Sequence, residues 1–302
     1  MKSYKEIMNS LSDDDLLRQM TQEEIDELRR IFLKSFRDLS DCCEKYGLTV
    51  MLIGGTALGA VRHKGFIPWD DDLDVAMPRK DFERLKEIFD KELGDKYTLA
   101  SPNYKRNARN RFPEMLVKGT RLVEAGQNPE DEENCVKLDI FIIENVPDNK
   151  VIQKIKGVWC SALMFMASCE DIFEKNDAFL RRYLSKTPAG KKAYDRRFAL
   201  GRLFSFRKFQ DWMNIVDRNL QYPKETTLMG IPSGRKHYFG EIRPRETFLP
   251  ASKGEFEGMV VNLPGKAEDY LSNLFGSDYM TLPPVEKRER HFIVDIRLKE
   301  NG

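Results

Sequence analysis

The sequence lacks the features that mark membrane-spanning, secreted and nucleic-acid-binding proteins. Its longest mostly apolar run, Gly157 to Cys169, is shorter than the roughly 18 residues that a spanning helix needs, so a buried helix explains it better. Residues 1–5 are not followed by the apolar stretch of a signal peptide. Lysine and arginine number 50 and aspartate and glutamate 49, which leaves a net charge of +1. A dedicated nucleic-acid binder is usually basic overall, so we expect no nucleic-acid partner.

Cysteine and histidine are also scarce. The five cysteines include the adjacent pair Cys42 and Cys43 but no Cys-x-x-Cys motif, which argues against a disulfide framework and a structural zinc site. The three histidines are scattered along the chain and form no zinc-binding pattern. A reduced, cytoplasmic compartment is the simplest interpretation of this composition.

The order of the expected elements indicates an α+β fold in two regions. Thr21 and Glu24 form a capping-box pattern before an amphipathic helix that ends near Gly47. Apolar runs then predict strands at 48–53, 73–77, 97–100, 115–118 and 136–143, with helices over 56–62 and 79–93. From about 150 to 220 only helices are expected, with a break near 187–190. We therefore expect one region of helices and strands over residues 1–148 and a second, mainly helical region over 149–302 that packs on the first.

Four aspartates stand within five positions where an apolar strand begins. Because alternate side chains of a strand share a face, Asp70, Asp72 and Asp74 are expected to point one way and Asp71 the other. Carboxylates so close together repel one another and resist joint ionisation. A hard divalent cation removes that problem, and carboxylate oxygens suit magnesium or manganese. An acidic run is usually a solvated loop, but this one enters an apolar strand.

A glycine pair precedes the aspartates. A Gly54-Gly55-Thr56 turn between a strand and a helix would leave backbone amides free and let a phosphate approach closely. A lone Gly-Gly is usually only a turn. In combination with a metal-binding acidic pair on the next strand, however, it describes a site for phosphoryl or nucleotidyl transfer.

The stretch from Gly54 to Val75 resembles the LicD family of phosphocholine transferases, within the polymerase-β-like nucleotidyltransferase superfamily; the fukutin-related sugar-phosphate transferases carry a related motif. The segment Arg-His-Lys-Gly-Phe-Ile-Pro-Trp-Asp-Asp-Asp, residues 62–72, is the most specific part of the match. Further similarity lies at 138–141 and at intervals between 256 and 284. The resemblance implies a nucleotidyltransferase-like mixed sheet with flanking helices, followed by a largely helical C-terminal half.

The resemblance also implies roles for individual residues. Asp72 and Asp74 would coordinate Mg2+ or Mn2+, with Asp70 as a supplementary ligand or a supporting residue. Asp139 would join them or take the proton from the attacking hydroxyl; as a charge inside an apolar strand it is costly unless paired or metal-bound. The expected donor-binding residues are Gly54, Gly55, Thr56, Arg62, His63, Lys64 and Trp69. The tryptophan would stack on a base or a choline head, or would only fill the core.

The implied reaction moves phosphocholine, or a related phospho-alcohol, from CDP-choline or another CDP-alcohol to a glycan hydroxyl. The acceptor would be a cell-surface glycan, such as teichoic acid or lipopolysaccharide, or its lipid-linked precursor. Two alternatives stay open: a nucleotidyltransferase that acts on a small molecule, and an inactive glycan-binding module. The segment from Arg181 to Lys208 carries ten basic residues and one acid, which fits an anionic acceptor at the inner face of the membrane or a solvated basic surface.

Overall fold

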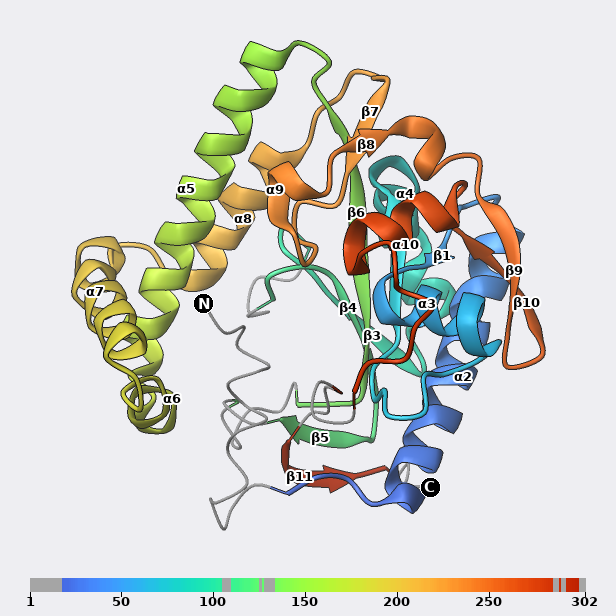
Figure 1. Ribbon diagram of the computed structural model, residues 1–302, viewed down its shortest axis with the longest axis horizontal. Coiled ribbons are helices and arrows are strands. Elements are labelled where there is room, and N and C mark those ends of the chain that lie inside the picture. The colour runs from blue at the N-terminus through green and yellow to red at the C-terminus, as the bar shows by residue number, and fades with distance from the viewer. Residues whose placement is uncertain are drawn as a thin grey trace. The chain divides into compact units, whose positions relative to one another are not determined.

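The computed structural model describes residues 18–104, 110–124, 127, 134–284, 288 and 292–298 (Figure 1). The chain divides into two compact units. Unit 1 contains residues 1–99, 114–143 and 243–302, and unit 2 contains residues 100–113 and 144–242. The last part of the chain, which we expected to belong with the helical half, therefore packs with the unit that holds most of the N-terminal residues.

The first described helix of unit 1 is α2 (Gln22–Lys45), and its start is the capping box that the sequence predicts. The Thr21 hydroxyl accepts a hydrogen bond from the backbone amide of Glu24, whose carboxylate accepts one from the amide of Thr21. These two bonds satisfy amides that have no partner within the helix. The apolar face then buries side chains three or four positions apart, including Leu28, Phe32 and Leu39.

A mixed sheet forms the centre of unit 1, which confirms the α+β class. Its strands lie in the order β1-β2-β6-β4-β3 (Figure 1). Strand β2 is parallel to β6, whereas β1 and β4 are antiparallel to their neighbours β2 and β6. The strand bounds are β1 (Met51–Leu52), β2 (Asp74–Pro78), β3 (Tyr97–Ala100), β4 (Glu114–Val117) and β6 (Lys137–Val146). All are within a few residues of the predicted ones.

Two helices connect the strands of unit 1, and the first one corrects the expected glycine turn. Gly54 and Gly55 are the first residues of α3 (Gly54–His63), which follows Ile53 in an extended conformation. Gly54 has a φ of +56°, a region that glycine enters without steric cost, so the chain passes from β1 into the helix without a separate turn. Helix α4 (Arg79–Glu92) lies where it was predicted.

The remaining elements of unit 1 are short, and most were not predicted. A two-stranded antiparallel hairpin and a small β5–β11 sheet supplement the main sheet. Their bounds, with those of the neighbouring short elements, are β5 (Arg121–Glu124), β8 (Arg243–Pro244), η1 (Arg245–Thr247), β9 (Ser252–Phe256), β10 (Met259–Leu263), α10 (Ala267–Phe275) and β11 (Ile293–Arg297).

Unit 2 is mainly helical, as the missing strand signals predict. Helix α7 begins at the expected break, where the Thr187 side chain caps the helix and Pro188 occupies its first position. The core of this unit packs Cys160 and Leu163 of α5 against Trp212 and Val216 of α8. The elements are α5 (Lys150–Lys175), α6 (Ala178–Leu184), α7 (Pro188–Phe204), α8 (Phe209–Leu220), β7 (Leu228–Gly230) and α9 (His237–Gly240).

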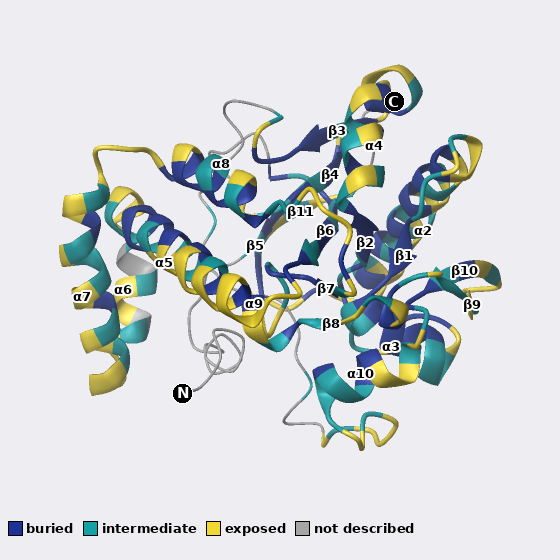
Figure 2. Ribbon diagram, turned by 90° about the horizontal axis from the view of Figure 1, so that it is seen from above, coloured by how far each residue is buried: buried dark blue, intermediate teal, exposed yellow. Residues whose placement is uncertain are grey.

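The apolar run from Gly157 to Cys169 lies in α5, but it is not a fully buried helix as we expected. Cys160, Leu163 and Ala167 are buried, whereas Val158, Trp159 and other apolar side chains on the opposite face are exposed (Figure 2). No helix in the described part of the chain combines the length and the apolarity needed to cross a membrane.

Candidate functional site

Three acidic residues lie side by side across the central strands of unit 1. Asp74, the first residue of β2, is the register partner of Asp139 on the parallel strand β6. On the other side of β6, Asp139 pairs with Glu114 of β4. Residues that pair across neighbouring strands share a face of the sheet, so the three carboxylates emerge on one side. Glu114 is a site residue that the sequence analysis missed, because a single acid at the start of an apolar strand carries no motif.

Asp139 occupies the most unusual electrostatic environment of the three. Its Oδ1 atom is shielded from solvent and has no hydrogen-bond partner among the described residues. Burial raises the pKa of Asp139 well above its ordinary value, although the Lys137 cation acts in the opposite direction. Lys137 itself is held by an ion pair of 2.8 Å between its Nζ and Glu114 Oε1. The site therefore contains a carboxylate that a further positive charge would stabilise.

The aspartate run shows the predicted alternation in burial. Asp71 is buried, whereas Asp70, Asp72 and Asp74 are half-buried. Regular strand structure begins only at Asp74, so the preceding aspartates lie on the segment that leads into β2. The guanidinium of Arg29 on α2 supports this segment by donating hydrogen bonds to the carbonyl of Asp70 and to two carbonyls before it, at 2.8 to 3.1 Å.

The two glycines of α3 are required because carboxylates pack directly against them. A Cβ atom on Gly54 would lie 2.8 Å from Asp74 Oδ2, and one on Gly55 would lie 2.9 Å from Asp70 Oδ2. The N-terminus of a helix carries a partial positive charge, so it stabilises both carboxylates. The backbone amide of Asp74 also donates a hydrogen bond of 2.9 Å to the Thr56 hydroxyl, which connects β2 to α3.

One of the amides that we expected to be free for a phosphate is occupied. The backbone amide of Gly54 donates a hydrogen bond of 3.2 Å to the hydroxyl of Tyr270, a buried residue of α10. The hydroxyl comes from 216 positions further along the chain, so no local pattern points to it. Tyr270 is thus a second site residue that sequence analysis did not identify, although it lies within the stretch that carries the family resemblance.

The expected cationic trio does not act as one group. Arg62 is partly buried and donates a hydrogen bond of 2.8 Å to the backbone carbonyl of Tyr279. Partial burial, followed by the neighbouring Arg62 cation, lowers the pKa of His63. Lys64 is exposed, ends α3 in a left-handed conformation, and accepts a hydrogen bond at its carbonyl from the amide of Glu257. Of the three, Arg62 is thus used structurally.

Trp69 lies beside this trio and is half-buried. Its ring meets the edge of His63, with centroids 6.4 Å apart, and the Arg288 guanidinium lies 4.2 Å over its face. A ring that stacks on a guanidinium offers the negative face that also attracts a quaternary ammonium. The face of Trp69 is thus already in contact with one cation, the guanidinium of Arg288.

The aspartates provide suitable atoms for a metal but not a ready-made ligand set. Among the described residues, no group of three histidine, cysteine, aspartate or glutamate side chains is arranged to hold an ion. The unpaired Oδ1 of Asp139 and its register partner Asp74 nevertheless supply the hard oxygen ligands that magnesium and manganese prefer. The residues fit such a cation, provided that they move together when it binds.

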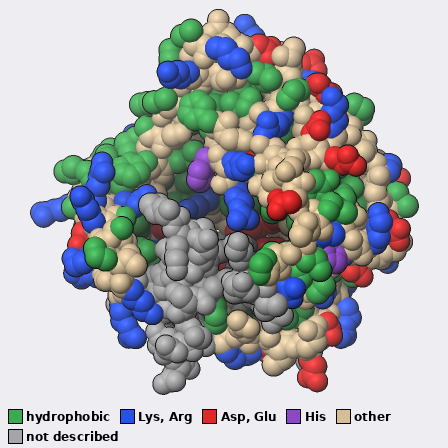
Figure 3. Space-filling view, in the orientation of Figure 1, with side chains coloured by type: hydrophobic (Ala, Val, Ile, Leu, Met, Phe, Trp, Pro, Cys, Tyr) green, Lys and Arg blue, Asp and Glu red, His purple; other side chains and the backbone are tan. Residues whose placement is uncertain are grey.

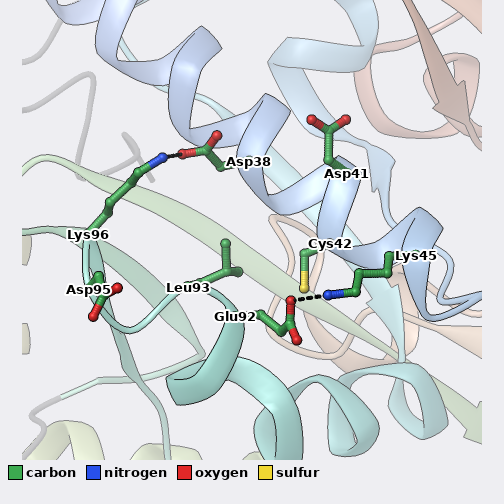
Figure 4. Close-up of a pocket in the computed structure, with 8 residues that line it drawn as sticks. All are labelled: Asp38, Asp41, Cys42, Lys45, Glu92, Leu93, Asp95 and Lys96. Carbon is green, nitrogen blue, oxygen red and sulfur yellow. Dashed lines mark hydrogen bonds and ion pairs between the residues drawn. The ribbon is translucent and has the colours of Figure 1, made fainter.

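A pocket elsewhere in unit 1 is lined by charged residues that include two ion pairs (Figure 4). It lies between α2 and α4, where Lys96 pairs with Asp38 at 2.9 Å and Lys45 pairs with Glu92 at 2.6 Å. None of the aspartates discussed above lines this pocket. It therefore carries no part of the candidate site.

Comparison with known proteins gives one family and three relatives. Residues 47–158 match the family described as LicD/FKTN/FKRP, nucleotidyltransferase domain. The chain is 28% identical over 256 residues to the lipopolysaccharide cholinephosphotransferase LicD of Haemophilus influenzae. This alignment covers 83% of this chain and 89% of that protein. A shorter match, 40% identical over 52 residues, covers 17% of this chain and 20% of the uncharacterized protein RP689 of Rickettsia prowazekii. Another, 38% identical over 60 residues, covers 19% of this chain and 19% of the uncharacterized protein RT0683 of Rickettsia typhi.

The matched span contains both functional motifs of the sequence. It begins just before the glycines of α3 and extends beyond Asp139 on β6. The resemblance of the motifs to the LicD family is therefore confirmed by the match over residues 47–158.

Proposed function

We propose that this chain is a metal-dependent transferase that moves phosphocholine, or a related phospho-alcohol, from a CDP-linked donor to a hydroxyl of a cell-surface glycan or its lipid-linked precursor. The observation that carries the proposal is the pairing of Asp74 with Asp139 beside the first turn of α3. The Haemophilus influenzae relative, which aligns over most of both chains, supports it, because its name describes a cholinephosphotransferase that acts on lipopolysaccharide.

Asp72, Asp74 and Asp139 would hold magnesium or manganese, with Asp70 in support. When bound, the cation supplies positive charge against the donor pyrophosphate and the carboxylates themselves. Asp139 is the best-fitted ligand, because its shielded Oδ1 has no hydrogen-bond partner among the described residues.

The transfer itself breaks one bond to phosphorus and forms another. The acceptor oxygen attacks the phosphorus that carries the choline, the bond from that phosphorus to CMP breaks, and CMP leaves with the bridging oxygen. The hydroxyl proton must go to a base within reach. Asp139 would take that proton in the alternative arrangement in which Asp72 and Asp74 alone hold the cation, because burial raises its pKa.

Recognition of the donor would use the loop that follows α3. We assign the choline head to the face of Trp69. The Arg288 guanidinium lies there in this structure, 4.2 Å from the ring centroid, and the quaternary ammonium of choline would replace it. His63 and Lys64 would contact the donor phosphates at the end of the helix. The carboxylate of Glu257, from the turn between β9 and β10, holds this loop by accepting a 3.0 Å hydrogen bond from the amide of Phe66.

Acceptor binding would involve the basic segment from Arg181 to Lys208. This segment runs from within α6 through α7 to Lys208, the residue before α8, and Arg196, Arg202 and Lys208 in it are exposed. Positive charge of this density attracts an anionic glycan or anionic lipid headgroups, which fits an enzyme at the inner face of the membrane.

A second candidate function is nucleotidyl transfer, which the description of the matched family favours. The two reactions differ in which phosphorus is attacked. Mass analysis of the acceptor after incubation with CDP-choline and magnesium separates them, because one product gains phosphocholine and the other gains CMP. A chain that cleaves none of CDP-choline, CDP-ribitol, CDP-glycerol and CDP-ethanolamine would be the inactive binding module, and an Asp74→Asn variant supplies the background rate.

A further inference from the structure

The N-terminal half of α5 exposes a continuous apolar strip. Val151 and Ile155 are each 66% exposed, Val158 is 56% exposed and Trp159 is 53% exposed. Positions three, four and eight apart lie on one face of a helix, so these side chains and Ile152 form a single strip, here called the α5 stripe. Single exposed apolar side chains are common on soluble proteins, but a contiguous strip of them is typical of a surface that binds a membrane or another protein.

The orientation of α5 is fixed, so the stripe cannot turn inward. On the opposite face, a Cβ atom on Gly157 would lie 2.4 Å from the ring of Phe239, which shows how closely α9 packs there. On one flank, the Trp159 indole donates a 3.1 Å hydrogen bond to Asn219 Oδ1. Lys156 donates hydrogen bonds to the backbone carbonyls of Asn219 and Gln221.

The charged residues within this part of α5 have one sign. Between Lys150 and Cys169 the sequence contains three lysines and no acidic residue. Lys150 and Lys154 are exposed beside the stripe. The nearest preceding acid, Asp148, accepts hydrogen bonds from the amide and the hydroxyl of Thr227, at 3.0 and 2.7 Å. An apolar strip with an interfacial tryptophan and a lysine border is the pattern of a helix that lies in the surface of an anionic bilayer.

Helix α7 and the residues just beyond it also expose apolar and basic side chains. Phe165, further along α5, lies 5.6 Å from the Arg197 guanidinium of α7. At the end of α7 and just beyond it, Leu203 and Phe206 are 66% and 70% exposed, beside exposed Arg207. Figure 3 shows hydrophobic side chains gathered over α5 with lysine and arginine side chains among them.

We propose that the α5 stripe is a membrane-binding surface that inserts its apolar side chains at the headgroup boundary of an anionic bilayer. Lys150, Lys154 and the basic side chains of α7 then contact the headgroups. The helix lies in the plane of the surface and does not cross it. This binding needs neither donor nor acceptor, so it stands or falls separately from the transferase reaction.

The test is sedimentation of the full chain with vesicles of phosphatidylcholine, with or without phosphatidylglycerol. The wild type binds the phosphatidylglycerol vesicles, and its tryptophan emission moves to shorter wavelength. A Val151→Ser/Ile155→Ser double variant binds at least about tenfold more weakly, because it loses apolar insertion while its fold is untouched. Val260→Ser is the matched control: Val260 is 77% exposed on β10 of unit 1, and its replacement leaves vesicle binding unchanged.

A Trp159→Phe variant locates the contact, because it keeps most of the apolar area but loses most of the emission shift. Equal vesicle binding by the wild type and the double variant overturns the proposal, as does a wild type that ignores phosphatidylglycerol vesicles. Sedimentation velocity tests the other possible partner of the stripe, a second copy of this chain. A wild-type dimer that Val151→Ser/Ile155→Ser converts to a monomer would make the stripe an interface between two copies and would also overturn the proposal.

Discussion

Asp74 and Asp139 are register partners on the parallel strands β2 and β6, so carboxylates from two distant motifs emerge side by side on one face of the sheet. Asp74 also packs against the first glycine of α3, and Asp139 keeps one oxygen without a hydrogen-bond partner among the described residues. Asp74 thus lies at the N-terminus of α3, and Asp139 lies on the central strand β6. Each of the following experiments addresses one part of this arrangement or of the structure that supports it.

Replacing Asp72 or Asp74 by Asn should lower turnover at least about 100-fold, because the site loses charge that balances the reacting phosphate, and one lost stabilising group costs about that much in comparable sites. The measurement is the rate of CMP release from CDP-choline with magnesium. Asp90→Asn, on the exposed side of α4, is the control and should be as active as the wild type. Near-normal rates in both site variants would remove these aspartates from the mechanism.

Asp139→Asn should reduce turnover and yet stabilise the metal-free protein at neutral pH. Burial raises the pKa of Asp139 above its ordinary 3.8, so the folded state binds its proton more tightly than the unfolded state does. Wild-type stability therefore falls as pH rises from about 4 toward the raised pKa, whereas the Asn variant escapes this loss. Melting temperatures with EDTA should coincide below pH 4 and diverge in favour of the variant at pH 7.5. A variant that is less stable than the wild type at pH 7.5 would contradict the assignment.

Gly54→Ala should be much more damaging than Gly47→Ala. Both glycines have left-handed backbones, with φ of +56° and +65°, so each substitution costs about 1–2 kcal/mol in backbone strain. Only at Gly54 does the new Cβ meet a side chain, Asp74 Oδ2 at 2.8 Å, whereas nothing lies within 4 Å at Gly47. We expect both variants to lose stability in urea titrations and only Gly54→Ala to lose activity. Equal activities would show that this close packing does not matter for the reaction.

Tyr270→Phe should lower turnover by a factor of less than about ten and stability by about 1 kcal/mol, which is typical of one lost hydrogen bond. The reason is that the Tyr270 hydroxyl accepts a hydrogen bond from the backbone amide of Gly54 and thereby orients the start of α3. Tyr46→Phe is a matched control, since it removes a 2.6 Å hydrogen bond to Glu92 outside the site. The control should lose stability but keep its turnover. A larger loss of turnover in Tyr270→Phe than in Tyr46→Phe would show that Tyr270 positions α3 for the reaction, and equal losses would show that it only stabilises the fold.

Glu24→Gln should show a pH-dependent loss of stability. Hydrogen bonds from the Arg18 guanidinium, at 2.6 and 2.7 Å, are the main cause that lowers the pKa of Glu24 to about 2. Because the folded pKa is depressed, the ionised carboxylate stabilises the fold above pH 4.5, and this contribution is lost as pH falls toward 2. The difference in unfolding free energy between wild type and variant should therefore shrink across that interval. A difference that stays constant between pH 7 and pH 2 would contradict this assignment.

Local signals in the sequence were sufficient for the longer helices, for the strands of the central sheet and for the aspartate motif. The capping box at Thr21 and Glu24 and the helices of residues 150–220 depend on neighbours a few positions away, and all of them are present. The burial of Asp71 between its less buried neighbours likewise agrees with the predicted alternation, although β2 itself begins only at Asp74. The resemblance of the glycine and aspartate motifs to the LicD family was confirmed for the same reason, since it rests on contiguous residues.

Tertiary structure alone decided which distant groups complete the site. Glu114 joins it through the register of β4 on β6, and Tyr270 joins it by reaching the Gly54 amide from α10. It also decided that Gly54 opens a helix and that one face of α5 stays exposed. Strand register and helix orientation are set by the sum of many long-range contacts, each too weak to leave a local pattern. The sequence by itself therefore determined the chemistry that is present, and the fold determined which of those groups meet.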